Sequence, residues 1–140
     1  MAGVFGRVAL ISGAGSSDGI GFATAKLLLA AGAKVAITST TDRIFERLAE
    51  LGAGLDQAFA MTADLTRPDD VAALLAGVES ALGGVDILVN NAGMVQLGRD
   101  APSTQLIDQT PEGWAYGIDI NLNSAFLMTR AVLGGMVARG

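Results

Sequence analysis

The stretch Val8-Ala9-Leu10-Ile11-Ser12-Gly13-Ala14-Gly15-Ser16-Ser17-Asp18-Gly19-Ile20-Gly21 decides the fold of this chain. It starts with an apolar run of strand length, passes through a glycine-rich turn and leads directly into a run of helix length. Glycine lets the backbone approach a pyrophosphate without a β-carbon in the way, and a helix N-terminus behind it offers N–H groups. This context favours a dinucleotide-phosphate loop over a glycine-rich turn without a ligand.

The candidate phosphate-binding residues are the glycines of this stretch, the two hydroxyl residues between them and the residue that opens the helix. They are Gly13, Gly15, Ser16, Ser17, Gly19, Ile20 and Gly21.

Composition excludes several classes of function. A length of 140 residues with 51% hydrophobic residues fits one domain with a buried core. A net charge of −5, without a run of Lys or Arg, argues against nucleic-acid and anionic-membrane surfaces. The absence of Cys and His excludes disulfides, thiolate metal sites and Cys nucleophiles, and removes the commonest catalytic base. The N-terminus lacks the long apolar stretch of a signal peptide, because it is interrupted by Gly3, Gly6 and Arg7. The later apolar run contains Lys26 and Lys34, which argues against a membrane span. We therefore expect a cytoplasmic protein.

Apolar runs of strand length alternate with runs of helix length, which predicts an α/β fold, a Rossmann-type doubly wound parallel sheet. The predicted strands are Arg7–Ile11, Lys34–Thr38, Gln57–Thr62 and Val85–Asn90. The predicted helices are Gly19–Ala31 with Gly32 as its stop, Asp42–Leu51, a helix to Leu82 that Thr66 caps and Pro68 opens, and a long helix from Thr110-Pro111 to Ala138. Met94–Gln109 is predicted to be a loop.

Right-handed crossovers order these strands 3-2-1-4 and leave the fourth strand at an open edge. An apolar strand at an open edge is prone to aggregation, so we expect residues 1–140 to be the N-terminal part of a nucleotide-binding domain, continued along the chain or completed by another chain. The alternative is a minimal four-stranded domain.

Four markers in this order resemble the short-chain dehydrogenase/reductase family, and in particular its 3-oxoacyl-acyl-carrier-protein reductases. They are the Ser12-Gly13 to Gly21 loop, Asp64-Leu65, Asn90-Asn91-Ala92-Gly93 and Ile120-Asn121-Leu122. The resemblance implies an oxidoreductase that transfers hydride between a nicotinamide and a small carbonyl or alcohol substrate. The loop departs from the family pattern, because Ser12 replaces the usual Thr and the loop is slightly longer. The sequence therefore leaves open whether Gly13 or Gly15 takes the role of the first glycine.

The end of the second predicted strand decides between NADP and NAD. A carboxylate there would bind the ribose 2′-hydroxyl of NAD and repel a 2′-phosphate, and the family pattern places Ser39 at this position. Hydroxyls and a cation at Ser39, Thr40 and Arg43 favour NADP. Asp42 is the evidence for the alternative, NAD, although an acid at the start of a helix is more often a capping or first-turn residue.

The resemblance implies further roles at the remaining markers. Asp64 would bind the adenine amino group beside the backbone of Leu65, although Asp64 could instead cap the turn after the third strand. The segment Asn91, Ala92 and Gly93 would line the ribose. Asn121 would be a catalytic residue whose carbonyl holds a water in a proton relay, although from the sequence alone it could equally be a solvent-facing Asn within a helix.

The chain lacks the Ser and the Tyr-x-x-x-Lys pair of this family, since its one Tyr is Tyr116 and its lysines are Lys26 and Lys34. We therefore expect no useful turnover from this chain alone. The alternatives are a non-catalytic dinucleotide-binding module or one half of a split enzyme. The resemblance also implies that the helix from Pro111 contributes to a homo-oligomer of the full-length protein, whereas oligomer formation by this chain stays open.

Overall fold

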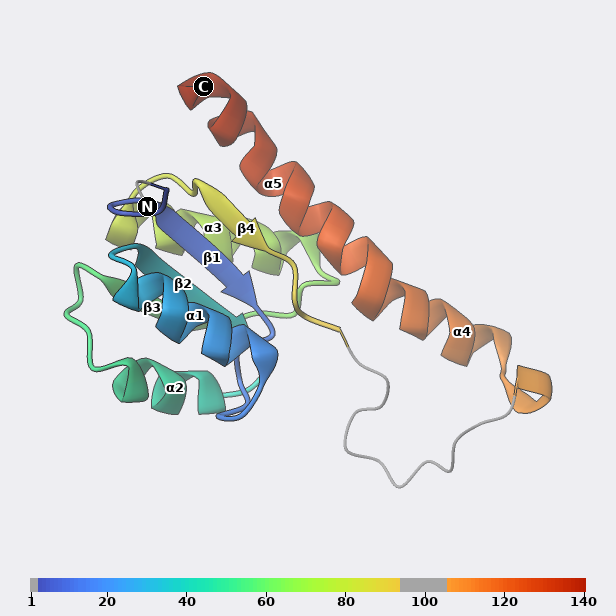
Figure 1. Cartoon of the computed structure of the whole chain (residues 1–140). Helices are drawn as coiled ribbons and strands as arrows, with labels where there is room; N and C mark the ends of the chain where they lie inside the picture. The colour runs from blue at the N-terminus through green and yellow to red at the C-terminus, as the bar shows by residue number, and fades with distance from the viewer. Residues whose placement is uncertain (1–2, 94–105) are drawn as a thin grey trace.

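The computed structural model describes residues 3–93 and 106–140, and its core is one parallel sheet (Figure 1). The four strands are β1 (Val8–Ser12), β2 (Lys34–Ser39), β3 (Ala58–Thr62) and β4 (Ile87–Val89). They lie in the order β3-β2-β1-β4, with parallel pairing throughout. The predicted α/β class and strand order are confirmed.

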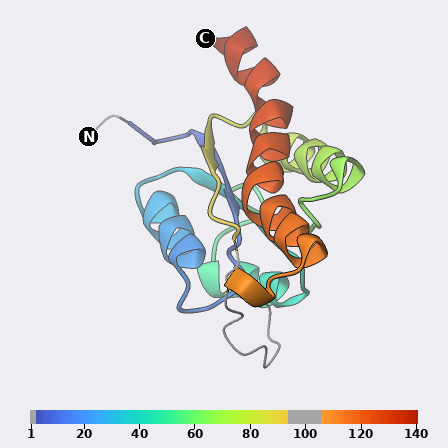
Figure 2. The same ribbon diagram turned by 90° about the vertical axis from the view of Figure 1, so that its right-hand side faces the viewer.

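Helices cover both faces of the sheet. The α-helices are α1 (Ile20–Ala30), α2 (Arg43–Leu51), α3 (Pro68–Leu82), α4 (Pro111–Ile118) and α5 (Ser124–Arg139). Figure 2 shows α1 on one side of the strands and α3 with α5 on the other. Successive residues of a strand point to opposite faces, so Ile11 packs in the cluster that includes Ala25 of α1, whereas Leu10 packs in the cluster that includes Leu74 of α3.

The fourth strand is shorter than predicted. Only Ile87–Val89 pairs with β1, whereas the prediction was Val85–Asn90. One residue before the paired segment, Asp86 binds Val8 through both its backbone and its side chain. The Asp86 amide donates to the Val8 carbonyl at 2.9 Å, and the Asp86 carboxylate accepts from the Val8 amide at 3.0 Å. The strand lies at the edge of the described sheet, as predicted, and all its residues are half-buried.

The start of α3 corrects one predicted cap. Arg67, and not Thr66, occupies the N-cap position, and the helix begins at Pro68 without a side-chain cap bond. The Thr66 hydroxyl instead donates to a carboxylate oxygen of Asp64 at 2.7 Å. Short polar side chains can bond to nearby residues within a turn instead of capping a helix. Because the Thr66 hydroxyl is bonded to Asp64, it does not cap α3. The predicted stop of α1 is present, because Gly32 adopts a φ of +87° directly after the helix.

The predicted long helix is continuous but contains a π-helical turn, Asp119–Asn123 (η2), between α4 and α5. Its start is as predicted, since the Thr110 hydroxyl accepts from the Gly113 amide at 3.0 Å. Most of the predicted loop Met94–Gln109 lies outside the described residues, and the described part includes a short 3-10 helix, Leu106–Asp108 (η1). Among the described helices, none combines the length and apolar character that crossing a membrane requires.

Candidate functional site

The carboxyl ends of β1 and β4 are joined through the hydroxyl of Ser12. This hydroxyl donates to the Val89 carbonyl at 3.2 Å and accepts from the amides of Asn91 at 3.0 Å and Ala92 at 2.9 Å. Ser12 is 1% exposed, so these bonds form away from solvent. The serine therefore fixes where the chain leaves β4. Sequence reasoning noted Ser12 as a departure from a family pattern but did not include it among the site residues.

The side chain of Asn91 holds the glycine-rich loop from the other side. Its amide group donates to the carbonyls of Ser12 at 3.0 Å and Gly13 at 3.1 Å. Both donor hydrogens of the amide are thereby used within the protein. The predicted ribose-lining role of Asn91, Ala92 and Gly93 stays a prediction. The structure shows that the first two of these residues pack against the loop.

Two glycines of the loop are required by protein packing. Gly13 has a φ of +70°, and a β-carbon there would lie 2.7 Å from the Cα of Ala92. At Gly21 a β-carbon would lie 2.5 Å from the side-chain nitrogen of Asn91 and 2.8 Å from the Gly13 carbonyl oxygen. Gly13, and not Gly15, therefore makes the tight left-handed turn after β1, and the role of either glycine in binding phosphate stays a prediction.

The N-terminus of α1 fits an anion. Gly19 is the N-cap, no side chain caps the helix and its first turn contains no acid. By contrast, α3 carries Asp69 and Asp70 in its first turn. First-turn N–H groups without a capping side chain bind phosphate readily, and the helix dipole favours the negative charge. Ile20, which opens α1, is exposed at the surface.

An acidic side chain lies on the same loop. The Ser16 hydroxyl donates to a carboxylate oxygen of Asp18 at 2.5 Å, and this hydrogen bond lowers the pKa of Asp18 below its ordinary value. Ser16, Ser17 and Asp18 are all exposed. The loop thus carries a negative charge beside the predicted phosphate-binding residues, and sequence reasoning did not assign it a role.

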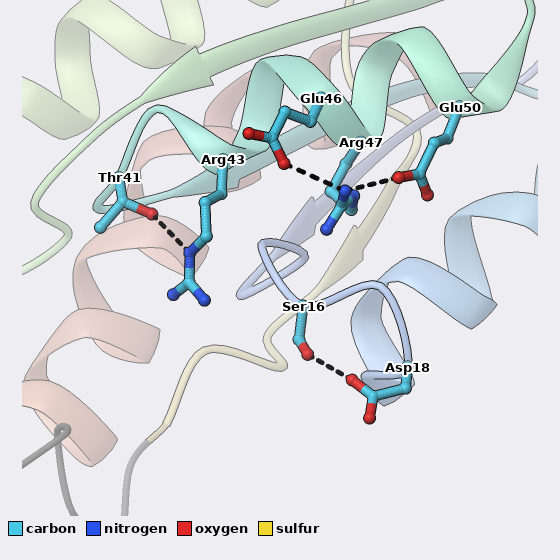
Figure 3. Close-up of polar contacts among 7 residues, drawn as sticks. All are labelled: Ser16, Asp18, Thr41, Arg43, Glu46, Arg47 and Glu50. Carbon is cyan, nitrogen blue, oxygen red and sulfur yellow. Dashed lines mark hydrogen bonds and ion pairs between the residues drawn. The ribbon is translucent and has the colours of Figure 1, made fainter.

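The end of β2 lies directly against the loop. A β-carbon on Gly15 would be 3.0 Å from both the Cβ and the Oγ of Ser39. The Ser39 hydroxyl donates to the Thr41 carbonyl at 3.0 Å. The Arg43 guanidinium donates to the Thr41 hydroxyl at 3.3 Å (Figure 3). Thr40 is also exposed here. The structure therefore brings the predicted phosphate loop and the predicted 2′-selecting residues together.

Asp42 occupies the N-cap position of α2, but its side chain makes no cap hydrogen bond. The prediction that Asp42 lies at the start of a helix is thus confirmed, although its side chain forms no capping bond.

A second arginine of α2 is held by protein contacts. The Arg47 guanidinium is in ion-pair contact with Glu46 at 3.2 Å and with Glu50 at 2.5 Å. It also lies 5.7 Å from the ring centroid of Phe22 on α1, and the residue is 8% exposed. Two carboxylates offset its charge, so within the described residues Arg43 is the less compensated cation of α2, since it forms no ion pair there.

At the end of β3, Asp64 closes a turn. One of its carboxylate oxygens accepts from the amide of Thr66 at 3.0 Å and from the hydroxyl of the same residue at 2.7 Å. The hydroxyl bond is the main cause that lowers the pKa of Asp64. Leu65 is buried in the core. The turn-capping alternative is therefore present, and adenine recognition by Asp64 and Leu65 stays a prediction.

Asn121 lies at the π-helical turn and meets the end of the β4 segment. Its side-chain nitrogen donates to the Gly117 carbonyl at 3.0 Å, and a β-carbon on Gly93 would lie 2.8 Å from its side-chain oxygen. Single π-helical turns are frequent at functional sites. Tyr116 is exposed on α4, whereas Lys26 and Lys34 lie on α1 and β2. The chain's one tyrosine thus has no lysine from the same helix beside it.

Comparisons with known proteins give one consistent family. A family model described as short chain dehydrogenase matches residues 7–140. The 3-oxoacyl-acyl-carrier-protein reductase of Vibrio cholerae is 38% identical over 135 residues, which cover 96% of this chain and 51% of that protein. The chain spans about half the length of the curated relatives it matches.

Solved structures agree with this result. A metagenomic short-chain oxidoreductase in complex with NADP is 34% identical with a TM-score of 0.82, and the match covers 97% of this chain and 59% of that one. An NADPH-bound short-chain oxidoreductase from Pseudomonas aeruginosa PAO1 is 30% identical with a TM-score of 0.84, and the match covers 98% of this chain and 52% of that one.

Proposed function

The chain belongs to the short-chain dehydrogenase family, and from this premise we propose that residues 1–140 are the nucleotide-binding part of an NADP-dependent oxidoreductase. The reaction is hydride transfer between the nicotinamide and a small carbonyl or alcohol substrate, as in the 3-oxoacyl reductase that this chain resembles. The bound nicotinamide would supply the hydride or accept it. The residues of this chain hold and orient the dinucleotide.

One observation carries the proposal: the glycine-rich loop, an uncapped helix N-terminus and the end of β2 meet at the carboxyl ends of the strands. The loop is fixed by Ser12 and Asn91, and α1 begins behind it without a capping side chain. Ligands of open α/β sheets bind outside the carboxyl ends of the strands, where these groups lie. A pyrophosphate at the start of α1 fits this donor set.

The choice of NADP is supported by the end of β2. Ser39 and Thr40 place hydroxyls there and Arg43 adds a cation, while no carboxylate occupies the Ser39 position. A 2′-phosphate would gain hydrogen-bond donors without meeting the acid that selects NAD. The solved relatives with NADP or NADPH bound are in keeping with this choice.

Proton transfer is assigned to groups outside this sequence. We propose that Asn121, in the π-helical turn, is a catalytic residue whose carbonyl holds a water of the proton relay, as the family resemblance implies, and that this chain alone has no useful turnover. Its tyrosine, Tyr116, has no lysine four residues on, and loss of a general acid of this type costs about 10²–10⁴-fold in rate.

The exposed apolar side chains of α5 and the turn before it, which include Leu122, Phe126 and Val137, support a protein contact in the longer, homo-oligomeric enzyme. The same proposal includes a cytoplasmic location.

A non-catalytic dinucleotide-binding module is the second candidate. Both candidates require dinucleotide binding, and they differ in turnover by the protein that contains this chain. The test is a titration of the purified chain with NADPH and NADH, followed by ligand fluorescence and by melting temperature. Saturable binding with stabilisation, stronger for NADPH, supports the proposal, because a ligand of the native state raises its stability by mass action. Absence of binding by both dinucleotides contradicts it.

A further inference from the structure

The segment that follows β4 lies beside η2 and the first half of α5 (Figure 1 and Figure 2). The Asn90 side-chain nitrogen donates to the Thr129 hydroxyl at 3.0 Å. At the other end of the segment, a β-carbon on Gly93 would lie 2.8 Å from the side-chain oxygen of Asn121. Residue numbers rise along the segment while they fall along the helix, so the two run antiparallel.

The two contacts leave this segment little slack. The three positions from Asn90 to Gly93 span at most about 11 Å of extended chain, and the eight positions from Asn121 to Thr129 rise about 12 Å along a helix. The segment is also held from its other side, by bonds from the Asn91 side chain to the glycine-rich loop. A shift of α5 along its axis would therefore break the bond to Thr129 and move Asn121 relative to the segment.

The opposite face of α5 is held by apolar packing. Met128 and Val132 are 1% and 4% exposed, and they lie in the same core cluster as Leu74 of α3. Burial of this kind is non-directional, so it holds the two helices together without fixing their register. Polar links can fix the register, and α5 has a second one at its end, where the Arg139 guanidinium donates to the Val85 carbonyl at 2.5 Å.

Of these two polar links, the one at Thr129 is nearer to the π-helical turn. Arg139 lies about 27 Å along the helix from Asn121, whereas Thr129 lies about 12 Å from it. The bond between Asn90 and Thr129 is exposed and competes with water, but it joins two segments that already lie side by side. It is therefore placed to set the position of the turn.

We infer that Thr129 is a positioning residue, which holds α5 in register with the segment after β4 and thereby places Asn121 for its part in the proton relay. This inference rests on the proposed function, which gives Asn121 that part. The effect of Thr129 is indirect, because its hydroxyl bonds Asn90 and the helix carries the constraint to the π-helical turn.

The test is Thr129→Val, which keeps the shape of the side chain and removes the hydroxyl. Since we expect no turnover from this chain alone, the readout is NMR of the isotope-labelled chain. We expect the native-state shifts of Asn121 and Gly93 to change. The amide of Ser124 donates to the Asp119 carbonyl within the π-helical turn. Its hydrogen exchange should become about threefold to tenfold faster, the range that loss of one hydrogen bond allows.

Two further variants separate positioning from a plain loss of stability. Thr129→Ser keeps the hydroxyl and should restore the wild-type shifts of Asn121 and Gly93. Thr24→Val is the matched control, because the Thr24 hydroxyl donates to the Ile20 carbonyl of its own helix at 2.8 Å. It should leave both shifts unchanged. Because Asn121 lies about 12 Å along the helix from Thr129, a change there reports movement of the turn and not the substitution itself.

Changed shifts in Thr129→Val that Thr129→Ser restores support the inference. A lower melting temperature without changed shifts at Asn121 and Gly93 overturns it, because Thr129 would then only stabilise the chain. Equal changes in Thr129→Ser or in Thr24→Val overturn it as well. A titration of the wild-type chain with NADPH tests the proposed function separately. If NADPH does not bind, the proposed function fails together with the role of Asn121, and if NADPH binds while the shifts stay unmoved, only the inference fails.

Discussion

The two sides of the candidate site are built differently. On the β1 and β4 side, Ser12 and Asn91 form hydrogen bonds between residues almost eighty positions apart, mostly shielded from solvent. On the β2 and α2 side, Ser39 and Arg43 are bonded to Thr41, two positions away, at an exposed surface. The first side fixes the shape of the loop, and the second side leaves polar groups available to a ligand.

This difference predicts two classes of mutation. Changes on the β1 and β4 side should lower the free energy of unfolding and lose binding as a consequence. Changes on the β2 and α2 side should leave stability almost unchanged and alter which dinucleotide binds. A result in the wrong class at any position below would contradict the distinction.

The largest effect is expected for Gly13→Ala. The new β-carbon would lie 2.7 Å from the Cα of Ala92, and the residue would have to keep a φ of +70°. We expect a loss of more than about 2 kcal/mol in the free energy of unfolding, measured by urea denaturation, together with loss of NADPH binding.

Gly134→Ala is the matched control, because a β-carbon at Gly134 in α5 meets no atom within 4 Å. Alanine in a helix interior should stabilise the chain by about 0.5–1 kcal/mol. If Gly13→Ala is tolerated as well as this control, the proposed packing of the loop is wrong.

Ser12→Ala should have the next largest effect. It removes the hydroxyl that accepts from the amides of Asn91 and Ala92, which are only partly accessible to water. An unsatisfied buried group of this kind costs about 1–3 kcal/mol, measured by urea denaturation. Ser124→Ala is the control, because Ser124 is similarly buried but its hydroxyl bonds the Ile120 carbonyl of its own helix. We expect Ser124→Ala to lower the free energy of unfolding by less than about 1 kcal/mol. Equal losses in the two variants would contradict the proposal that Ser12 joins β1 to β4.

Ser39→Asp tests the selecting side. A carboxylate at the end of β2 would repel a 2′-phosphate and could bind a ribose 2′-hydroxyl. We expect the affinity for NADPH to fall about tenfold or more, which corresponds to about 1.4 kcal/mol, while the unfolding midpoint stays close to wild type. Ser39→Asn has the same shape without the charge and should retain NADPH binding. Similar losses in both variants would indicate a steric effect and contradict the electrostatic account.

The smallest effect concerns pH. The pKa of Asp64 is lowered in the folded chain, mainly by the bond from Thr66, so its contribution to stability is present above the unfolded pKa, about 4, and is lost as pH falls through the lower folded pKa. Asp64→Asn should therefore lose less stability than wild type between about pH 6 and pH 3 in urea denaturation. Glu79→Gln is the control for the loss of one carboxylate, because the Glu79 side chain makes no hydrogen bond within the described residues. Equal pH dependence in Asp64→Asn and wild type would contradict this assignment.

Much of the fold could be predicted from the sequence, because it depends on periodicity. The apolar runs at β1 and β2 and the stop at Gly32 carry local signals that the structure confirms. The local competition between Thr66 and Arg67 for the N-cap of α3 could not be decided from residue types alone. The shortened β4 depends on the contact between Asp86 and Val8, which lie far apart in sequence.

The sequence could mark candidate site residues, but not the contacts that they make. The glycines and Asn91 were marked by their order and spacing, but only the folded chain shows that Gly13 and Gly21 are required by packing. Ser12 and Asp18 were not selected, because a serine at the end of a strand and an acid in a loop have no distinctive pattern. The folded chain shows the hydrogen bonds that they accept, from the amides of Asn91 and Ala92 at Ser12 and from the Ser16 hydroxyl at Asp18.

The central claim, that the strand-end loop and the end of β2 form one dinucleotide site, is tested most directly by NMR. Backbone amide shifts of the isotope-labelled chain would be followed while NADPH is added. The account predicts saturable shifts at Gly13–Gly21 and Ser39–Arg43, and also at the predicted adenine and ribose segments Asp64–Leu65 and Asn91–Gly93, with no change near Glu79 at the far end of α3. Shifts centred on the apolar face of α5, or no saturable shift at all, would contradict the account.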